Sequence, residues 1–259
     1  MAADVEITTA TVVLLVLAGF VAGWVDAVVG GGGLIQLPAL LLVPGISPVQ
    51  ALATNKLAGF LGTSVSAVTY YRRVRPGLRT AAPMAAAALA GAAGGAALAT
   101  LLPASVFRPV ILVALVLVAV YTIARPEVGR ATALRWTGGR HLGAAVGLGA
   151  VIGCYDGLLG PGTGTFLVIA LVAILGYSFL EASANAKIVN AATNLGALVV
   201  FTLYGAPLWK LGLVVGAANV AGAYLGARMA VERGSAFVRV VFVVVVGALI
   251  VRLAWDVLA

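Results

Sequence analysis

Residues 23–40 have the sequence GWVDAVVGGGGLIQLPAL, in which four consecutive glycines interrupt an apolar stretch. The run before them, Thr11 to Val29, is long enough to cross a bilayer, whereas the run after them, Leu34 to Val43, is too short. Backbone that is not helical is tolerated at membrane depth only where protein buries it or where it lines a wet cavity. We therefore expect a re-entrant or broken helix at these glycines.

The composition places this break in a membrane protein. Of the 259 residues, 63% are hydrophobic and 9% are charged, whereas soluble domains carry about 25% charged residues. The net charge of +8 is then expected to reflect topology, and we expect no nucleic acid as a partner. The expected surrounding is the lipid bilayer, and the chain leaves no room for a soluble domain.

A second stretch of the chain repeats the first. Asp156 stands four positions before the motif Gly160-Pro161-Gly162-Thr163, as Asp26 stands four positions before Gly30 to Gly33. After a slippage of one residue the correspondence continues, pairing Ser47 with Ser178, Lys56 with Lys187, Thr63 with Asn194, Gly91 with Gly222, and Gly95 with Gly226. Secondary transporters are commonly built by internal duplication. We therefore divide the chain into a first transmembrane repeat, residues 1–130, and a second, residues 131–259.

The apolar runs follow the same order in both repeats. The first repeat has long runs at about 11–29, 48–71, 79–102 and 104–124 and a short run at about 34–43, and the second has long runs at about 142–159, 182–204, 208–230 and 236–258 and a short run at about 165–175. The sequence predicts an all-α polytopic membrane protein with two homologous halves. Each half contributes three full spans and one glycine-rich re-entrant or broken hairpin.

The arginines indicate how the halves are oriented. They gather in three loops, at 72–79, 125–140 and 228–239, and the positive-inside rule assigns all three loops to the cytoplasm. All three lie on one side only if each half crosses the membrane an odd number of times. We therefore prefer inverted repeats. A parallel repeat stays open, because the run at 11–29 is long enough to span alone.

Two lysines are the most informative side chains. Lys56 and Lys187 lie near the starts of apolar segments at equivalent positions, and an ionisable group inside a membrane marks a pathway or a partner. We predict that both bind substrate. The alternatives are snorkelling toward an interface or a structural ion pair with Asp26 or Asp156.

The glycine loops and the nearby amides are further candidates for binding. Free N–H groups at the start of a short helix suit an anion, although glycines also permit close helix packing. The candidate substrate-binding residues beside the lysines are Gly31, Gly32, Gly33, Gly162, Gly164, Asn55, Asn190 and Asn194, with Thr163, Thr165 and Gln36 as weaker candidates on the loops.

The remaining chemistry-bearing residues have simpler interpretations. Asp26 and Asp156 either couple transport to protons or stabilise their hairpins. His141 is predicted to be solvated in a basic loop, and Cys154 to be a small packing residue. We expect no metal, no cofactor and no enzyme, because the chain carries neither a metal-ligand cluster nor a pairing of nucleophile and base.

These motifs resemble a known family. The stretches Gly23 to Leu40 and Gly153 to Phe166, with Thr54 to Lys56 and Asn185 to Lys187, are similar to the sulfite exporter permeases, the TauE/SafE or TSUP group, over essentially the whole chain. The resemblance implies transport of sulfite, a sulfonate or a related small sulfur-containing anion across the bacterial inner membrane, driven by protons. Because Ala186 replaces the Asn that precedes the first lysine, the halves cannot bind substrate identically.

Two other functions stay open at this point. A passive anion channel would use the same helix dipoles, and a membrane partner subunit of a sulfur-metabolising system would not select the substrate itself. Glycines such as Gly91 and Gly222 predict close helix packing, either within one chain or between copies in a homo-oligomer.

Overall fold

A computed structural model describes residues 8–99, 129 and 131–258. All regular structure in these residues is helical, as the sequence predicts, while the segment expected at 104–124 lies outside them. The helices are α1 (Thr9–Val29), α2 (Gly33–Leu41), α3 (Pro48–Val74), α4 (Leu78–Ala99), α6 (Gly138–Leu158), α7 (Thr163–Ala170) with its π-helical continuation η2 (Leu171–Leu175), α8 (Phe179–Leu203) and α9 (Trp209–Leu258).

Serine caps begin the two central helices at equivalent positions. The Ser47 hydroxyl accepts the N–H of Gln50, and the Gln50 side chain accepts the N–H of Ser47, which closes a capping box before α3. The Ser178 hydroxyl accepts the N–H of Glu181 before α8. The start of each central helix is therefore determined locally.

Glycines with positive φ end or bend helices where the sequence analysis places boundaries. Gly30 ends α1 with φ of 84°, and Gly234 bends α9 with φ of 74°. Side chains are disfavoured at such angles, so glycine is the natural residue there. The bend at Gly234 separates the two runs predicted at 208–230 and 236–258.

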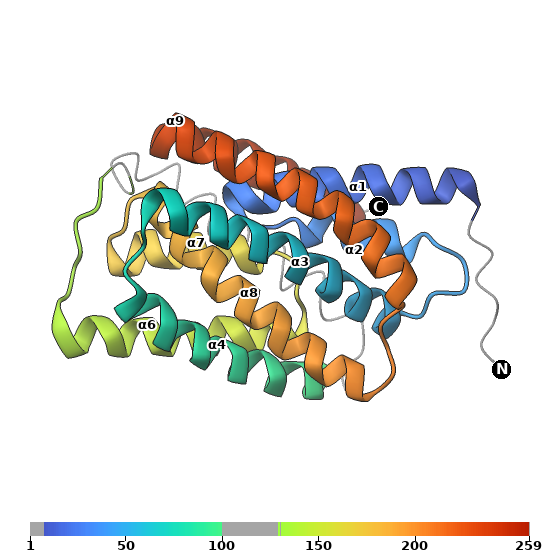
Figure 1. Cartoon of the computed structure of the whole chain (residues 1–259), viewed down its shortest axis with the longest axis horizontal. Coiled ribbons are helices and arrows are strands. Elements are labelled where there is room, and N and C mark those ends of the chain that lie inside the picture. The colour runs from blue at the N-terminus through green and yellow to red at the C-terminus, as the bar shows by residue number, and fades with distance from the viewer. Residues whose placement is uncertain (1–7, 100–128, 130, 259) are drawn as a thin grey trace.

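The first helix of each predicted half packs along a helix of the other half. In Figure 1, α1 lies along α9, and α6 lies along α4. Glycines bring these backbones together: a Cβ atom at Gly91 would overlap the carbonyl oxygen of Ala150, and one at Gly222 would overlap that of Phe20. The predicted close packing therefore occurs within the chain.

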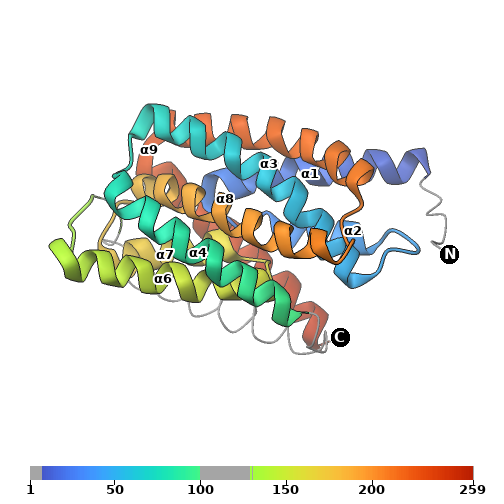
Figure 2. The ribbon, with the colours of Figure 1, turned by 60° about the horizontal axis from the view of Figure 1, so that its bottom comes forward.

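The two central helices join these pairs into one body. α3 packs against α9, α8 packs against α4, and α3 and α8 pack against each other. In Figure 2, α3 and the first part of α9 lie above α8, and α4 and α6 lie below it. The lysine-bearing helices α3 and α8 thus connect the two helix pairs.

The glycine loops meet in the middle of the molecule. In Figure 1, α1 runs inward from the right-hand end and α6 runs inward from the left-hand end, and the short helices α2 and α7 follow their loops. The backbone of Gly164 lies directly against that of Gly30. Two broken hairpins therefore approach each other from opposite ends.

The outer surface is suited to lipid. Within the described residues, four helices, α1, α4, α6 and α8, are long and apolar enough to cross a membrane. Large apolar side chains are exposed on several helices, including Leu17 at 59%, Val151 at 70% and Leu203 at 81%. A contiguous surface of this kind is unfavourable in water and favourable in a bilayer. The chain is a multi-pass membrane protein.

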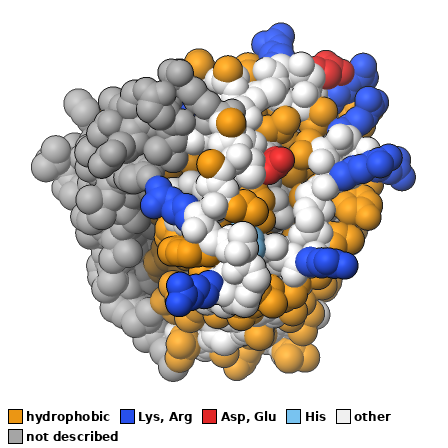
Figure 3. Space-filling view, turned by 90° about the vertical axis from the view of Figure 1, so that its left-hand side faces the viewer, with side chains coloured by type: hydrophobic (Ala, Val, Ile, Leu, Met, Phe, Trp, Pro, Cys, Tyr) orange, Lys and Arg blue, Asp and Glu red, His pale blue; other side chains and the backbone are white. Residues whose placement is uncertain are grey.

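The arginine-rich segments gather at one end. The end of α3, the starts of α4 and α6 and the bend of α9 all lie at the left of Figure 1, and Figure 3 shows Lys and Arg side chains around that end face. Arg125 and Arg130 lie outside the described residues. Such a grouping at one end is expected if each half of the chain crosses the membrane an odd number of times. The assignment of this end to the cytoplasm stays a prediction.

The prediction that His141 is solvated is wrong. Its side chain is buried in the first turn of α6, and Nε2 lies 3.1 Å from the hydroxyl oxygen of Tyr177. Burial raises the pKa of the Tyr177 phenol, which therefore stays protonated. The sequence shows the basic neighbours of His141 but not that Tyr177, just before α8, packs over the start of α6.

Candidate functional site

A polar cavity lies where the glycine loops meet the central helices. It encloses about 410 Å³ of space not filled by atoms, including the space at its mouth. Its lining comprises Asp26, Gly31, Gly32, Gly33 and Gln36 from the first hairpin, Asn55, Lys56, Gly59 and Thr63 from α3, Asp156, Gly160, Gly162, Thr163 and Gly164 from the second hairpin, Asn190 and Asn194 from α8, and Asn219 from α9.

The loops present backbone N–H groups to this cavity. The first N–H groups of a helix have no partner within the helix, and the structure leaves several of them unpaired here. Among the described residues, the N–H groups of Gly31, Gly33, Gly162 and Gly164 donate no hydrogen bond. Buried N–H groups rarely stay unpaired. These donors are therefore available to a ligand, and they favour a negatively charged one.

Lys56 provides the cation that lines the cavity. Its Nζ atom lies 2.7 Å from Oδ2 of Asp156, and both side chains are 2% exposed. The Thr163 hydroxyl donates to the other carboxylate oxygen of Asp156 over 2.6 Å. Gly160 makes room for the lysine, since a Cβ atom there would lie 3.2 Å from Nζ. This ion pair joins the first half of the chain to the second.

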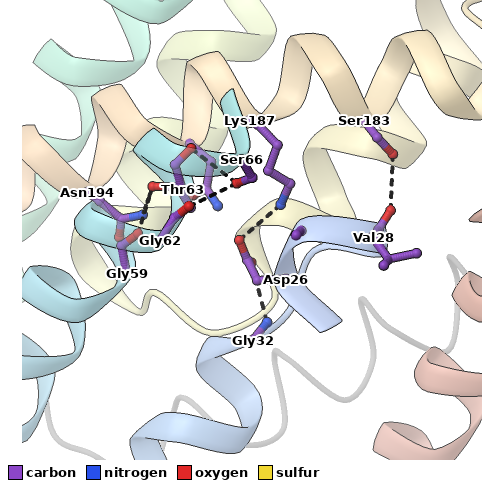
Figure 4. A network of polar contacts seen from close by, with 12 residues as sticks. Asp26, Val28, Gly32, Gly59, Gly62, Thr63, Ser66, Ser183, Lys187 and Asn194 are labelled. Carbon is purple, nitrogen blue, oxygen red and sulfur yellow. Dashed lines mark hydrogen bonds and ion pairs between the residues drawn. The ribbon is translucent and has the colours of Figure 1, made fainter. Parts of the chain in front are cut away.

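Lys187 forms the equivalent pair with Asp26, but in a different setting. Its Nζ atom donates to Oδ2 of Asp26 over 3.0 Å, and the lysine is fully buried while the aspartate is 15% exposed. The N–H of Gly32 donates to the other carboxylate oxygen over 3.4 Å. Figure 4 shows Asp26 between Lys187 and Gly32. Here only the aspartate, and not the lysine, lines the cavity.

Amides and hydroxyls from α3 and α8 complete the wall. Asn194 donates from Nδ2 to the hydroxyl of Thr63 over 3.5 Å, and Thr63 donates to the carbonyl of Gly59 over 2.7 Å, as Figure 4 shows. Asn190 accepts from the Thr193 hydroxyl through Oδ1, which leaves its NH₂ group for the cavity. Donors thus outnumber acceptors among the groups without partners.

The charges of the site balance before any ligand binds. Two lysines face two aspartates, so the excess attraction for an anion comes from unpaired N–H groups and helix dipoles. Among the residues that the structure describes, no three His, Cys, Asp or Glu side chains gather to hold a metal ion. The arrangement can hold a small oxyanion by hydrogen bonds from several sides.

Comparison with known proteins identifies the family. The profile described as sulfite exporter TauE/SafE matches residues 15–253, which is most of the chain. The chain belongs to the sulfite exporter TauE/SafE family. No solved structure matches this member of the TauE/SafE family.

Relatives of this TauE/SafE protein match it over nearly their whole lengths. A probable membrane transporter protein of a Sinorhizobium species, ORF9, is 38% identical over 248 residues, covering 93% of this chain and 92% of its own. The probable membrane transporter protein YfcA of Escherichia coli K12 is 34% identical over 244 residues, covering 94% and 89%. A probable membrane transporter protein of Haemophilus influenzae is also 34% identical, covering 94% of both chains.

Most residues that the sequence analysis selects for this TauE/SafE protein come together in the structure. All of the predicted site residues line the cavity except Lys187 and Thr165. Lys187 reaches the site through Asp26. Thr165 is buried behind the loop, and its hydroxyl has no hydrogen-bond partner among the described residues.

Two cavity residues, Gly59 and Asn219, escaped the sequence analysis, and another was underrated. Asn219 lies on α9 and is 5% exposed. The only sequence signal is a single amide within the apolar run 208–230, at the position paired with Ala88. Gln36, the weaker candidate, is 2% exposed and lines the cavity. Symmetry between the repeats was the main guide to the site, and it cannot point to unrepeated residues.

Proposed function

We propose that the protein is a secondary permease that moves sulfite, a sulfonate or a related small sulfur-containing anion across the bacterial inner membrane, coupled to protons. The observation that carries the proposal is the cavity between the two glycine loops, with Lys56 and four unpaired loop N–H groups around it. The family and the relatives named as membrane transporters support transport as the activity.

The chemistry of the lining favours an oxyanion over a cation or a neutral solute. The four loop N–H groups without described partners and the NH₂ group of Asn190 are donors, which suit several oxygens on one small centre. A sulfite or sulfonate group presents three such oxygens.

Inverted repeats would explain how the site opens to both sides. The motifs of residues 1–130 recur in residues 131–259, and the two broken hairpins approach the cavity from opposite ends. In transporters of this construction, one repeat rocks against the other around a site at mid-membrane. The arginine-rich end would face the cytoplasm.

Proton coupling would follow from competition for Lys56. In the empty site, Asp156 neutralises this lysine at 2.7 Å. A bound anion would compete with Asp156 for the lysine, and a proton taken up by the released carboxylate would restore the balance of charge until the ion pair re-forms. In this scheme Lys187 and Asp26 hold the first loop in place.

Uptake into proteoliposomes tests the proposal. Labelled sulfite, thiosulfate and a short sulfonate are offered with and without an imposed pH gradient. We expect gradient-stimulated uptake of at least one of them by the wild-type protein. Asp156→Asn should remove the stimulation, whereas Glu232→Gln, a change at an exposed carboxylate on α9, should keep it.

The outcomes separate the remaining functions. Equal uptake by the wild-type protein with and without the pH gradient would favour a passive channel. If none of the anions enters the proteoliposomes, with or without the pH gradient, the chain would act as a partner subunit or carry a different solute. Retained stimulation in Asp156→Asn would remove Asp156 from the coupling scheme but leave transport itself intact.

A further inference from the structure

Three buried amides form a continuous chain of hydrogen bonds along one wall of the cavity. Asn219 of α9 donates from Nδ2 to Oε1 of Gln36 over 2.8 Å. Gln36 of α2 donates from Nε2 to Oδ1 of Asn55 of α3 over 2.9 Å. Exposure of these side chains is between 2% and 7%. The chain of amides therefore links three helices at the site.

The direction of donation along this chain has a chemical consequence. Each amide donates with its NH₂ group and accepts with its oxygen, so the orientation at one end determines the orientation at the other. Because Gln36 donates to the oxygen of Asn55, the NH₂ group of Asn55 is left over. No described acceptor bonds to it, and it lies beside Gly33 in the cavity wall, 3.5 Å from where a Cβ atom would be.

Two glycines hold Asn219 at the start of the chain. The side-chain oxygen of Asn219 lies so close to Gly62 of α3 that a Cβ atom there would overlap it. The backbone of Asn219 lies equally close to Gly23 of α1. The amide is therefore confined between two helices, with its oxygen toward Gly62 and its NH₂ group toward Gln36.

The second half has no counterpart of this chain. The positions paired with Asn55 and Asn219 by the internal repeat are Ala186 and Ala88, and the position paired with Gln36 is Phe166. None of these side chains can donate a hydrogen bond. On the other side of the cavity, Asn190 of α8 presents its NH₂ group without such a chain of amides behind it.

We propose that Asn219 is a positioning residue for substrate: acting through Gln36, it turns the NH₂ group of Asn55 toward a bound oxyanion. The proposal rests on the anion site of the proposed function and adds to it a specificity device that lies on α9, outside the duplicated motifs. Reversal of the chain would present the oxygen of Asn55 to the anion, which would repel it.

A double-mutant cycle on the Michaelis constant tests this assignment. Wild-type protein, Asn219→Leu, Asn55→Ala and the double variant are reconstituted, and uptake is measured against the concentration of whichever of sulfite, thiosulfate or a short sulfonate the wild type transports. We expect each single change to raise KM about tenfold, as for the loss of one hydrogen bond to a charged group. The double variant should show no further rise, with maximal rates within about threefold.

A matched control and two contrary outcomes complete the test. Asn185→Ala removes another buried amide on α8, which bonds only to the carbonyl of Glu181 and does not line the cavity, and it should leave KM unchanged. If the rises in KM caused by the two single changes multiply in the double variant, Asn219 acts independently of Asn55 and the proposal is overturned. The proposal is also overturned if Asn219→Leu lowers only the maximal rate, because Asn219 is then structural. If the wild type transports none of the anions, the anion site itself fails, and the role of the amides fails with it.

Discussion

At the contact between α4 and α6, Gly91 lies against the backbone of Ala150, and at the contact between α1 and α9 the equivalent Gly222 lies against that of Phe20. The cavity keeps this correspondence only in part. Asp26 and Asp156 both line it, but Lys56 lines it and Lys187 does not, and Asn55 is paired with Ala186. The two halves of the sequence thus match in the framework and differ in part at the site. The helix contacts that bring the two loops together are needed once in each half. A single small anion needs only one set of binding contacts, so the two halves can differ there.

The two ion pairs make this difference concrete. Both join the halves, with Nζ to Oδ2 distances of 2.7 Å for Lys56 with Asp156 and 3.0 Å for Lys187 with Asp26. A ligand can reach the first lysine directly, but it meets the second pair only through its aspartate. We infer that the first pair opens during transport and that the second stays closed. Three sets of variants test the contrast between the site and the framework.

The largest effect is expected at Lys56. Lys56→Gln removes the cation of the cavity and leaves Asp156 buried without its partner, so uptake should fall at least about 100-fold. Initial rates of uptake into proteoliposomes measure it. Lys210→Gln, a change at the exposed start of α9, should leave the rate as in the wild type. Comparable uptake in Lys56→Gln and Lys210→Gln would refute the role of this lysine.

The second pair should affect stability more than transport. Lys187→Gln alone leaves the Asp26 carboxylate uncompensated and should lower the free energy of unfolding by about 3 kcal/mol. Lys187→Gln with Asp26→Asn removes both charges and should restore much of that loss, with KM within a few-fold of the wild type. Thermal unfolding in detergent and uptake kinetics measure the two quantities. If this double variant loses uptake as completely as Lys56→Gln with Asp156→Asn, the two pairs are equivalent and the contrast is wrong.

The smallest effects should be equal in the two halves. Gly91→Ala and Gly222→Ala each force a methyl group against a backbone carbonyl, and each should destabilise the protein by about 2 kcal/mol. Gly94→Ala has no described neighbour within 4 Å and should leave stability unchanged or raise it by up to about 1 kcal/mol. Thermal unfolding in detergent compares the three variants. Clearly unequal losses at Gly91 and Gly222 would show that the framework, too, has lost its symmetry.

The sequence predicts the helices and most of the cavity because both depend on repeated, local signals. Glycine runs, serine caps and lysines within apolar segments are visible without any tertiary information, and the structure confirms the helices that they delimit. The pairing of Lys56 with Asp156 and of Lys187 with Asp26 was not predictable. The sequence alone allows each lysine to pair with either aspartate. The partner in the other half follows from the tertiary contact between the two hairpins.

Residues outside the repeated pattern were missed for a related reason. Asn219 has no counterpart, and its importance arises from Gln36, which is far from it in the sequence. His141 was misjudged because its burial depends on Tyr177 from the start of another helix. Contacts between distant segments leave no periodic trace, so a single chain read alone cannot reveal them.

The crossed packing of the hairpins also constrains how the protein is made. α1 rests on α9 and α6 rests on α4, so the first hairpin leaves the ribosome long before the helix that covers it exists. The first hairpin therefore reaches its final packing only after α9 is made, and a truncation before α9 would expose the first hairpin as well as the new end of the chain.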